Sequence, residues 1–212
     1  MEATMTWYRL LVVCASMLCA APALGDGALR GRLSTEIERF EGQFNGVVLV
    51  ARDGEVLVER AMGVRDQRTG EPNASDTLFR IGSLTKQLTA ATVLALVEEG
   101  KIELAAPLSR YLTEYPRENL TRGGVEVTIE HLLRHTSGVT RFEKLPAVRA
   151  RLWSQRIPPE LFLGELMQRP LSSTPGQQYA YSNTGYILLG EVVRRVTGGS
   201  FEQALRSRLL AA

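Results

Sequence analysis

The first periodic pattern of apolar positions along the chain is helical. Its members lie three or four residues apart, a spacing that places side chains on one helix face. These positions are Leu29, Leu33, Ile37 and Phe40. The period then changes: residues 44–51 form an apolar run rich in valine, and residues 55–62 fit a second strand. Between them, Asp53-Gly54 is typical of a two-residue type I′ turn. We therefore predict an amphipathic helix followed by an antiparallel β-hairpin.

A long helical pattern begins at Ser83 and ends at Gly100, because glycine readily terminates a helix. The positions expected on its buried face are Leu88, Ala91, Leu94, Ala95 and Val97. The middle of the chain is typical of short helices and loops.

Three further helices have recognisable start or stop signals. Thr128 is a good N-cap for a helix over residues 130–135. Pro159 fits the first turn of another helix, and a third helix is expected over residues 184–196, stopped by Gly198. The helix after Pro159 carries Leu161, Phe162, Leu166 and Met167.

Residues 1–23 have the pattern of a signal peptide. Arg9 precedes an apolar run over residues 10–21, and small residues precede a cleavage position after Ala23. The alternative is an uncleaved anchor, although about a dozen residues is short for a spanning helix. We predict a secreted or periplasmic protein with no membrane span once the signal is removed.

Composition excludes several classes of function. The 212 residues are 44% apolar and 23% charged with a net charge of +2, so no basic patch for nucleic acid is expected. Cys14 and Cys19 both lie in the signal segment, which leaves no cysteine for disulfides or metals. His131 and His135 are spaced to share a helix face but lack an H-E-x-x-H pattern, so we predict no metal and no cofactor.

The candidate chemistry starts with Ser83 and Lys86. Three positions apart on a helix, the two side chains lie on one face. A serine hydroxyl becomes a good nucleophile when a neighbour takes its proton, and a helix start favours negative charge. The alternatives are an N-cap or first-turn role for Ser83 and a solvated helix face for Lys86.

A second group, Tyr181-Ser182-Asn183, follows a Pro-Gly turn and precedes a helix. Tyr181 is a candidate general base for Ser83, and Asn183 is a candidate substrate-binding residue or a partner that orients Lys86. The alternatives are a buried tyrosine for Tyr181 and a helix N-cap for Asn183, a role compatible with substrate binding. Ser182 is the rival nucleophile. Whether Lys86 or Tyr181 is the dominant base stays open at this point.

Three stretches together resemble one family of serine hydrolases. They are residues 79–86 (FRIGSLTK), 128–138 (TIEHLLRHTSG) and 175–186 (PGQQYAYSNTGY). The family includes class C β-lactamases, low-molecular-weight penicillin-binding proteins, D-amino-acid peptidases and related esterases. The resemblance covers nearly everything after the signal segment.

The resemblance implies an α/β (α+β) fold, a β-lactamase/transpeptidase-like sandwich with an inserted, mostly helical domain. Residues 24–212 would be the N-terminal part of that domain, with a helix and hairpin over residues 24–80 and a mostly helical region with the active-site motifs over 81–200. No K-T-G or H-x-G motif follows Asn183. We therefore expect that the family's C-terminal strands lie outside this sequence.

The function implied is a serine acyl-hydrolase that forms a covalent acyl-enzyme with a lactam, a D-peptide or other amide, or an ester. Ser83, Lys86 and Tyr181 would be catalytic and Asn183 would bind substrate. The partner is a small-molecule or peptide substrate. The alternative is an impaired relative that only binds β-lactams or peptides or is slowly acylated by them.

Overall fold

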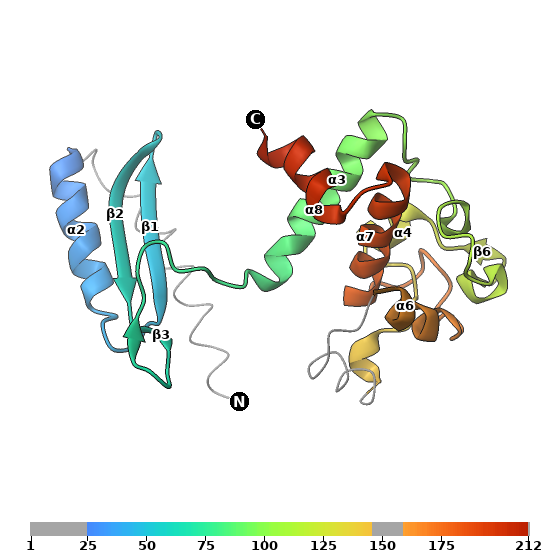
Figure 1. The fold of residues 1–212 in the computed structure, drawn as a ribbon, viewed down its shortest axis with the longest axis horizontal. Coiled ribbons are helices and arrows are strands. Elements are labelled where there is room, and N and C mark those ends of the chain that lie inside the picture. Colours follow the sequence, from blue (N-terminus) through green and yellow to red (C-terminus); the bar gives the residue numbers. More distant parts are fainter. Residues whose placement is uncertain (1–24, 146–158, 212) are drawn as a thin grey trace. The chain divides into compact units, whose positions relative to one another are not determined.

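The computed structural model describes residues 25–145 and 159–211 (Figure 1). The predicted signal segment, with Cys14 and Cys19, lies outside the described residues. The chain divides after Arg80 into two compact units, Met1–Arg80 and Ile81–Ala212. No helix in the described ranges is long and apolar enough to cross a membrane.

The first unit contains the predicted helix and hairpin. Helix α2 (Asp26–Glu38) is followed by strands β1 (Gly46–Arg52) and β2 (Glu55–Met62), which pair antiparallel (Figure 1). The turn residues Asp53 and Gly54 have φ values of 52° and 81°. Two successive positive φ angles are those of a type I′ turn, so the predicted turn is confirmed.

Helix α2 packs on β2 through its half-buried apolar face and through Arg30. The Arg30 guanidinium donates to the carbonyl oxygens of Val56 and Leu57 at 2.7 and 3.0 Å. A second, smaller sheet follows, formed by β3 (Val64–Asp66) and β4 (Glu71–Pro72).

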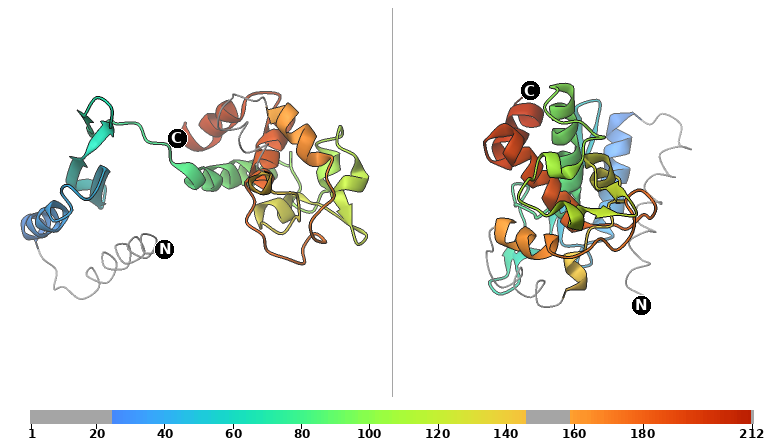
Figure 2. Two further views of the ribbon diagram at one scale, coloured as in Figure 1. Left: turned by 90° about the horizontal axis from the view of Figure 1, so that it is seen from below. Right: turned by 90° about the vertical axis from the view of Figure 1, so that its right-hand side faces the viewer.

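The second unit is mostly helical, with α7 at its centre. Helix α7 contacts α3, α4, α6 and α8 (Figures 1 and 2), and its buried apolar side chains belong to the main hydrophobic core of the described chain. The helices are α3 (Thr85–Glu98), α4 (Ile129–Leu133), α6 (Pro159–Met167), α7 (Asn183–Thr197) and α8 (Phe201–Leu205). The 3₁₀ turns are η1 (Gly82–Leu84), η2 (Leu108–Arg110), η3 (Arg117–Leu120) and η4 (Phe142–Lys144), and one π-helical turn, η5 (Arg206–Leu210), follows α8.

The sequence pattern did not predict a short hairpin in this unit. Strands β5 (Thr121–Arg122) and β6 (Val125–Glu126) pair across Gly123 and Gly124, whose φ values are 59° and 77°. Strands of two residues are too short to have a readable alternation, so only the glycine pair signalled the turn.

The predicted buried face of α3 is wrong in part. Leu94 is 47% exposed, while Val93 and Leu96 are fully buried together with Thr89 and Thr92. The two threonines tolerate burial because each hydroxyl donates to a backbone carbonyl four residues earlier, at 3.0 and 2.8 Å. A pattern built on apolar residues alone therefore placed the buried face incorrectly.

Helix α4 begins as predicted and ends earlier than predicted. The Thr128 hydroxyl accepts a hydrogen bond from the amide of His131, and the His131 ring accepts one from the amide of Thr128, which completes a capping box. The helix stops at Leu133 rather than His135 because His135 has a left-handed φ of 58°.

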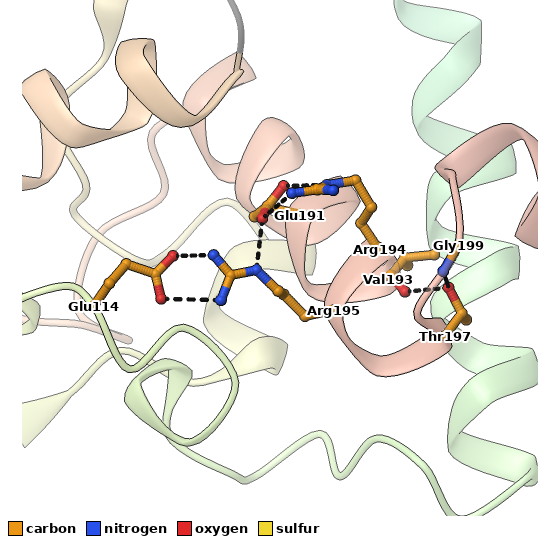
Figure 3. A network of polar contacts seen from close by, with 7 residues as sticks. All are labelled: Glu114, Glu191, Val193, Arg194, Arg195, Thr197 and Gly199. Carbon is orange, nitrogen blue, oxygen red and sulfur yellow. Dashed lines mark hydrogen bonds and ion pairs between the residues drawn. The ribbon is translucent and has the colours of Figure 1, made fainter.

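A polar network anchors the second half of α7 (Figure 3). The buried Glu191 carboxylate accepts hydrogen bonds from Arg194 and Arg195, each at 2.9 Å, and Arg195 also bonds Glu114 at 2.6 Å. Burial would raise the pKa of Glu191, but the two arginines outweigh it and hold that pKa below its ordinary value of 4.5.

We predict that Glu191→Gln lowers the free energy of unfolding by about 2 kcal/mol, since it removes charge-assisted hydrogen bonds from a buried site. The exposed pair formed by Glu202 and Arg206 is the matched control, and Glu202→Gln should change stability by less than about 0.5 kcal/mol.

The stability that Glu191 contributes should also depend on pH. Because the pKa of Glu191 is depressed in the folded protein, its contribution to the free energy of unfolding is present above pH 4.5 and is lost as the pH falls. Denaturant unfolding at pH 7 and pH 4 measures both effects; equal stability of the two variants at pH 7 would contradict the prediction.

Candidate active site

Ser83 lies in the 3₁₀ turn η1, which runs directly into α3. The turn begins at Gly82, whose φ of 53° is a left-handed value that favours glycine. Beyond its two chain neighbours, no residue that the structure describes comes within 4 Å of an added Cβ. Ser83 is exposed, so its hydroxyl is accessible to a ligand. The predicted position at the start of a helix is confirmed, with the helix proper beginning at Thr85.

The structure brings the four predicted site residues together. The hydroxyl oxygens of Ser83 and Tyr181 are 2.7 Å apart, a hydrogen bond in which either atom can donate. Lys86 Nζ lies 3.4 Å from Ser83 Oγ and donates to Asn183 Oδ1 at 2.5 Å. Its nitrogen also lies 4.8 Å from the centre of the Tyr181 ring. Ser83 from η1 and Lys86 from α3 thus meet Tyr181 from the loop before α7 and Asn183 from the first position of α7.

The N-cap of α7 is Ser182 and not Asn183. The Ser182 hydroxyl accepts a hydrogen bond from the amide of Gly185 at 3.0 Å, and Ser182 is only 3% exposed. The cap role considered for Asn183 is therefore wrong, because Ser182 fills it and Asn183 Oδ1 instead accepts from Lys86. Of the two candidate nucleophiles, only Ser83 is exposed.

His135 belongs to this cluster, and sequence reasoning missed it. Its ring centre lies 4.6 Å from that of Tyr181, and its Nδ1 accepts a hydrogen bond from the amide of Ser182 at 3.1 Å. Burial and the nearby Lys86 both lower the pKa of His135 below its ordinary value of 6.5. The signal was available, because His135 lies in one of the three family-like stretches, but the sequence pattern assigned it no role in the site.

Tyr186 is a second residue that the sequence analysis did not assign. Its ring centre lies 5.5 Å from Lys86 Nζ and 5.0 Å from the ring of His135, and its hydroxyl donates to the carbonyl of Leu133 at 3.1 Å. Burial, reinforced by Tyr181 and Tyr179, raises the pKa of Tyr186. The phenol is thus kept neutral while its ring faces Lys86.

Metal ligation has no support among the side chains that the structure describes. No group of three or more histidine, cysteine, aspartate or glutamate side chains there is arranged to hold a metal ion. His131 and His135 each use Nδ1 to accept a backbone amide, from Thr128 and Ser182. Both imidazoles thus have a structural partner in the protein.

Comparison with known proteins places this chain in a family. The profile of the beta-lactamase family matches residues 30–212. Esterase EstB of Burkholderia gladioli is 41% identical over 193 residues, covering 87% of this chain and 46% of its own length. The D-alanyl-D-alanine-carboxypeptidase/endopeptidase AmpH of Escherichia coli K12 is 30% identical over 166 residues, covering 77% of this chain and 42% of its own length. The chain therefore spans less than half the length of each of these two relatives.

Among solved structures, the D-amino acid amidase from Ochrobactrum anthropi SV3 is similar to this chain. It superimposes with a TM-score of 0.67 at 26% identity, covering 88% of this chain and 49% of its own. The predicted α/β (α+β) class with a β-lactamase/transpeptidase-like fold is thereby confirmed. The match over nearly the whole chain also confirms the resemblance inferred from the three stretches, and the chain belongs to the beta-lactamase family.

Proposed function

We propose that this chain carries the nucleophile and the proton-transfer residues of a serine acyl-hydrolase that works through a covalent acyl-enzyme. The observation that carries the proposal is the hydrogen bond of 2.7 Å between Ser83 Oγ and Tyr181 Oη, with Lys86 Nζ 3.4 Å from the same serine oxygen. A serine hydroxyl is activated when it lies within hydrogen-bond distance of a base and a third group orients that base.

Acylation follows from this geometry. In this mechanism Tyr181 acts in its phenolate form: its Oη takes the proton of Ser83 as Oγ attacks the carbonyl carbon of the substrate. The tetrahedral intermediate then collapses, the bond to the leaving group breaks, and the leaving group receives the proton from Tyr181. Ser83 Oγ is left bonded to the acyl group.

Tyr181 is the better placed of the two candidate bases. Its oxygen lies 2.7 Å from Ser83 Oγ, whereas Lys86 Nζ lies 3.4 Å from the same atom. Lys86 is committed to Asn183 at 2.5 Å, so Asn183 fixes the orientation of the lysine. We therefore assign Lys86 the role of stabilising negative charge on Tyr181 and on the serine oxygen.

Hydrolysis of the acyl-enzyme repeats these chemical steps, with water as the nucleophile in place of Ser83. Tyr181 takes a proton from water, the resulting hydroxide attacks the acyl carbon, and the bond between the acyl group and Ser83 Oγ breaks as Oγ regains a proton. A small-molecule or peptide ester, lactam or amide is the substrate class that this chemistry accepts. The 41% identity to EstB, described as an esterase, favours an ester.

We predict that an activated ester, a fluorescent penicillin or a phosphonate labels the full-length protein on Ser83, because its exposed hydroxyl faces the base. Peptide mass spectrometry identifies the labelled residue. Ser182→Ala is the control: it should cost about 1 kcal/mol of stability through loss of the helix cap and leave the label on Ser83. An adduct on Ser182, labelling that survives Ser83→Ala, or a wild-type protein that no probe labels would overturn the proposal.

We also predict that Lys86→Ala and Tyr181→Phe each slow acylation by about 10²–10⁴-fold while the protein stays folded, since both side chains act on the Ser83 proton. Single-turnover ester cleavage and circular dichroism measure the two properties. Full activity in either variant would remove that residue from the mechanism.

Export of the protein is a separate proposal and rests on the sequence alone. The apolar run over residues 10–21 and the small residues up to Ala23 support a secreted or periplasmic location. N-terminal sequencing of exported material should begin near Leu24. A cytoplasmic product that retains Met1 would contradict the proposal.

A further inference from the structure

The residue after helix α4 has an unusual backbone conformation. The amide of His135 donates to Leu132 O at 3.2 Å and the amide of Thr136 donates to His131 O at 2.8 Å, which together form a Schellman motif. The left-handed position of this motif usually holds glycine, but here it holds His135 with a φ of 58°. A side chain in this region costs of order 1 kcal/mol or more, so the imidazole has a conformational cost that glycine would avoid.

His135 contacts the segment 179–182 through both polar and apolar groups. Its Nδ1 accepts the amide of Ser182 at 3.1 Å, while its own carbonyl oxygen accepts the amide of Ala180 at 2.8 Å. The ring packs against Tyr181 with centres 4.6 Å apart and meets Tyr179 edge-on at 5.8 Å. His135 therefore holds the segment on both sides of Tyr181.

We propose that His135 is the positioning residue of the site: as a neutral acceptor for the Ser182 amide, it fixes the segment that presents Tyr181 to Ser83 and Asn183 to Lys86. This inference deepens the proposed function and rests on it. His135 itself touches neither Ser83 nor substrate in this account, and acts through Tyr181.

The proposal requires an unprotonated Nδ1. A protonated Nδ1 would point a donor at the donor N–H of Ser182 and break the bond. The titratable groups that face the ring in the described chain are Lys86 from α3, Tyr179 and Tyr181 before α7, and Tyr186 within α7. Burial and Lys86 lower the pKa of His135 below 6.5, so the neutral form prevails at pH 7 and is lost on acidification.

Two substitutions separate this role from a role in folding. His135→Gly removes the acceptor and relieves the left-handed backbone, whereas His135→Asn keeps an acceptor on the atom bonded to Cγ and tolerates the left-handed region. We expect His135→Gly to be at least as stable as wild type and to acylate about 10- to 100-fold more slowly, since small displacements of reacting groups have such effects. His135→Asn should keep most of the rate and lose the acid limb that His135 gives the wild-type pH profile.

The matched control is His131, which lies within α4. His131 also accepts a backbone amide through Nδ1, at 3.2 Å from Thr128. His131→Gln preserves a capping-box acceptor and should leave the acylation rate and its pH profile unchanged.

The measurements are single-turnover ester cleavage from pH 4 to 8, thermal unfolding, and NMR of the imidazole nitrogens in the full-length protein. Unprotonated Nδ1 of His135 at pH 7, with a slow but stable glycine variant rescued by asparagine, supports the proposal. Nδ1 carrying the proton, a glycine variant as fast as wild type, or an asparagine variant as slow as the glycine variant would overturn it. Labelling that survives Ser83→Ala would instead contradict the proposed function. The NMR measurement of protonation at His135 Nδ1 does not depend on that outcome, so the two failures can be distinguished.

Discussion

The site depends on the hydrogen bond that joins α3 to the start of α7, from Lys86 Nζ to Asn183 Oδ1 at 2.5 Å. Each of the two residues is close in the chain to a partner in the chemistry: Lys86 is three residues after Ser83, and Asn183 is two residues after Tyr181. Fixing one bond between the helices therefore fixes the distance between nucleophile and base. The same bond removes the need to bury an unpaired lysine nitrogen beside the core, which would be costly.

Residues with irregular backbone conformation, rather than regular helices, position the side chains of the site. Gly82 has a left-handed φ just before Ser83, and His135 has one just after α4. Gly138, also left-handed, allows its segment to approach the loop before α7 so closely that an added Cβ would lie 2.4 Å from Ser173 O. Two backbone hydrogen bonds, from Gly176 N to Thr136 O at 2.9 Å and from Ala180 N to His135 O at 2.8 Å, then hold the family-like stretches 128–138 and 175–186 side by side.

Much of this could be predicted from the sequence, because its signals are local. The Asp53-Gly54 turn, the Thr128 cap and the Ser83–Lys86 spacing each follow from a few neighbouring residues. The buried face of α3 could not be predicted, because its buried threonines satisfy their hydroxyls within the helix. The roles of His135 and Tyr186 were also missed, because both depend on contacts between segments that are about 50 residues apart in the chain. A sequence motif predicts which residues belong to the site, but it does not predict which residues each of them contacts in the folded protein.

We infer that Ser83 is acylated and that Tyr181 accepts its proton, while the hydrogen bond between Lys86 and Asn183 holds the two residues in place. The most direct test is a crystal structure of the full-length protein after reaction with a phosphonate ester, which mimics the tetrahedral intermediate. We expect a covalent bond from phosphorus to Ser83 Oγ, with Tyr181 Oη in hydrogen-bond contact with a phosphonate oxygen and the hydrogen bond between Lys86 and Asn183 intact. Phosphorus on another residue, or a Tyr181 hydroxyl turned away from the adduct, would contradict it.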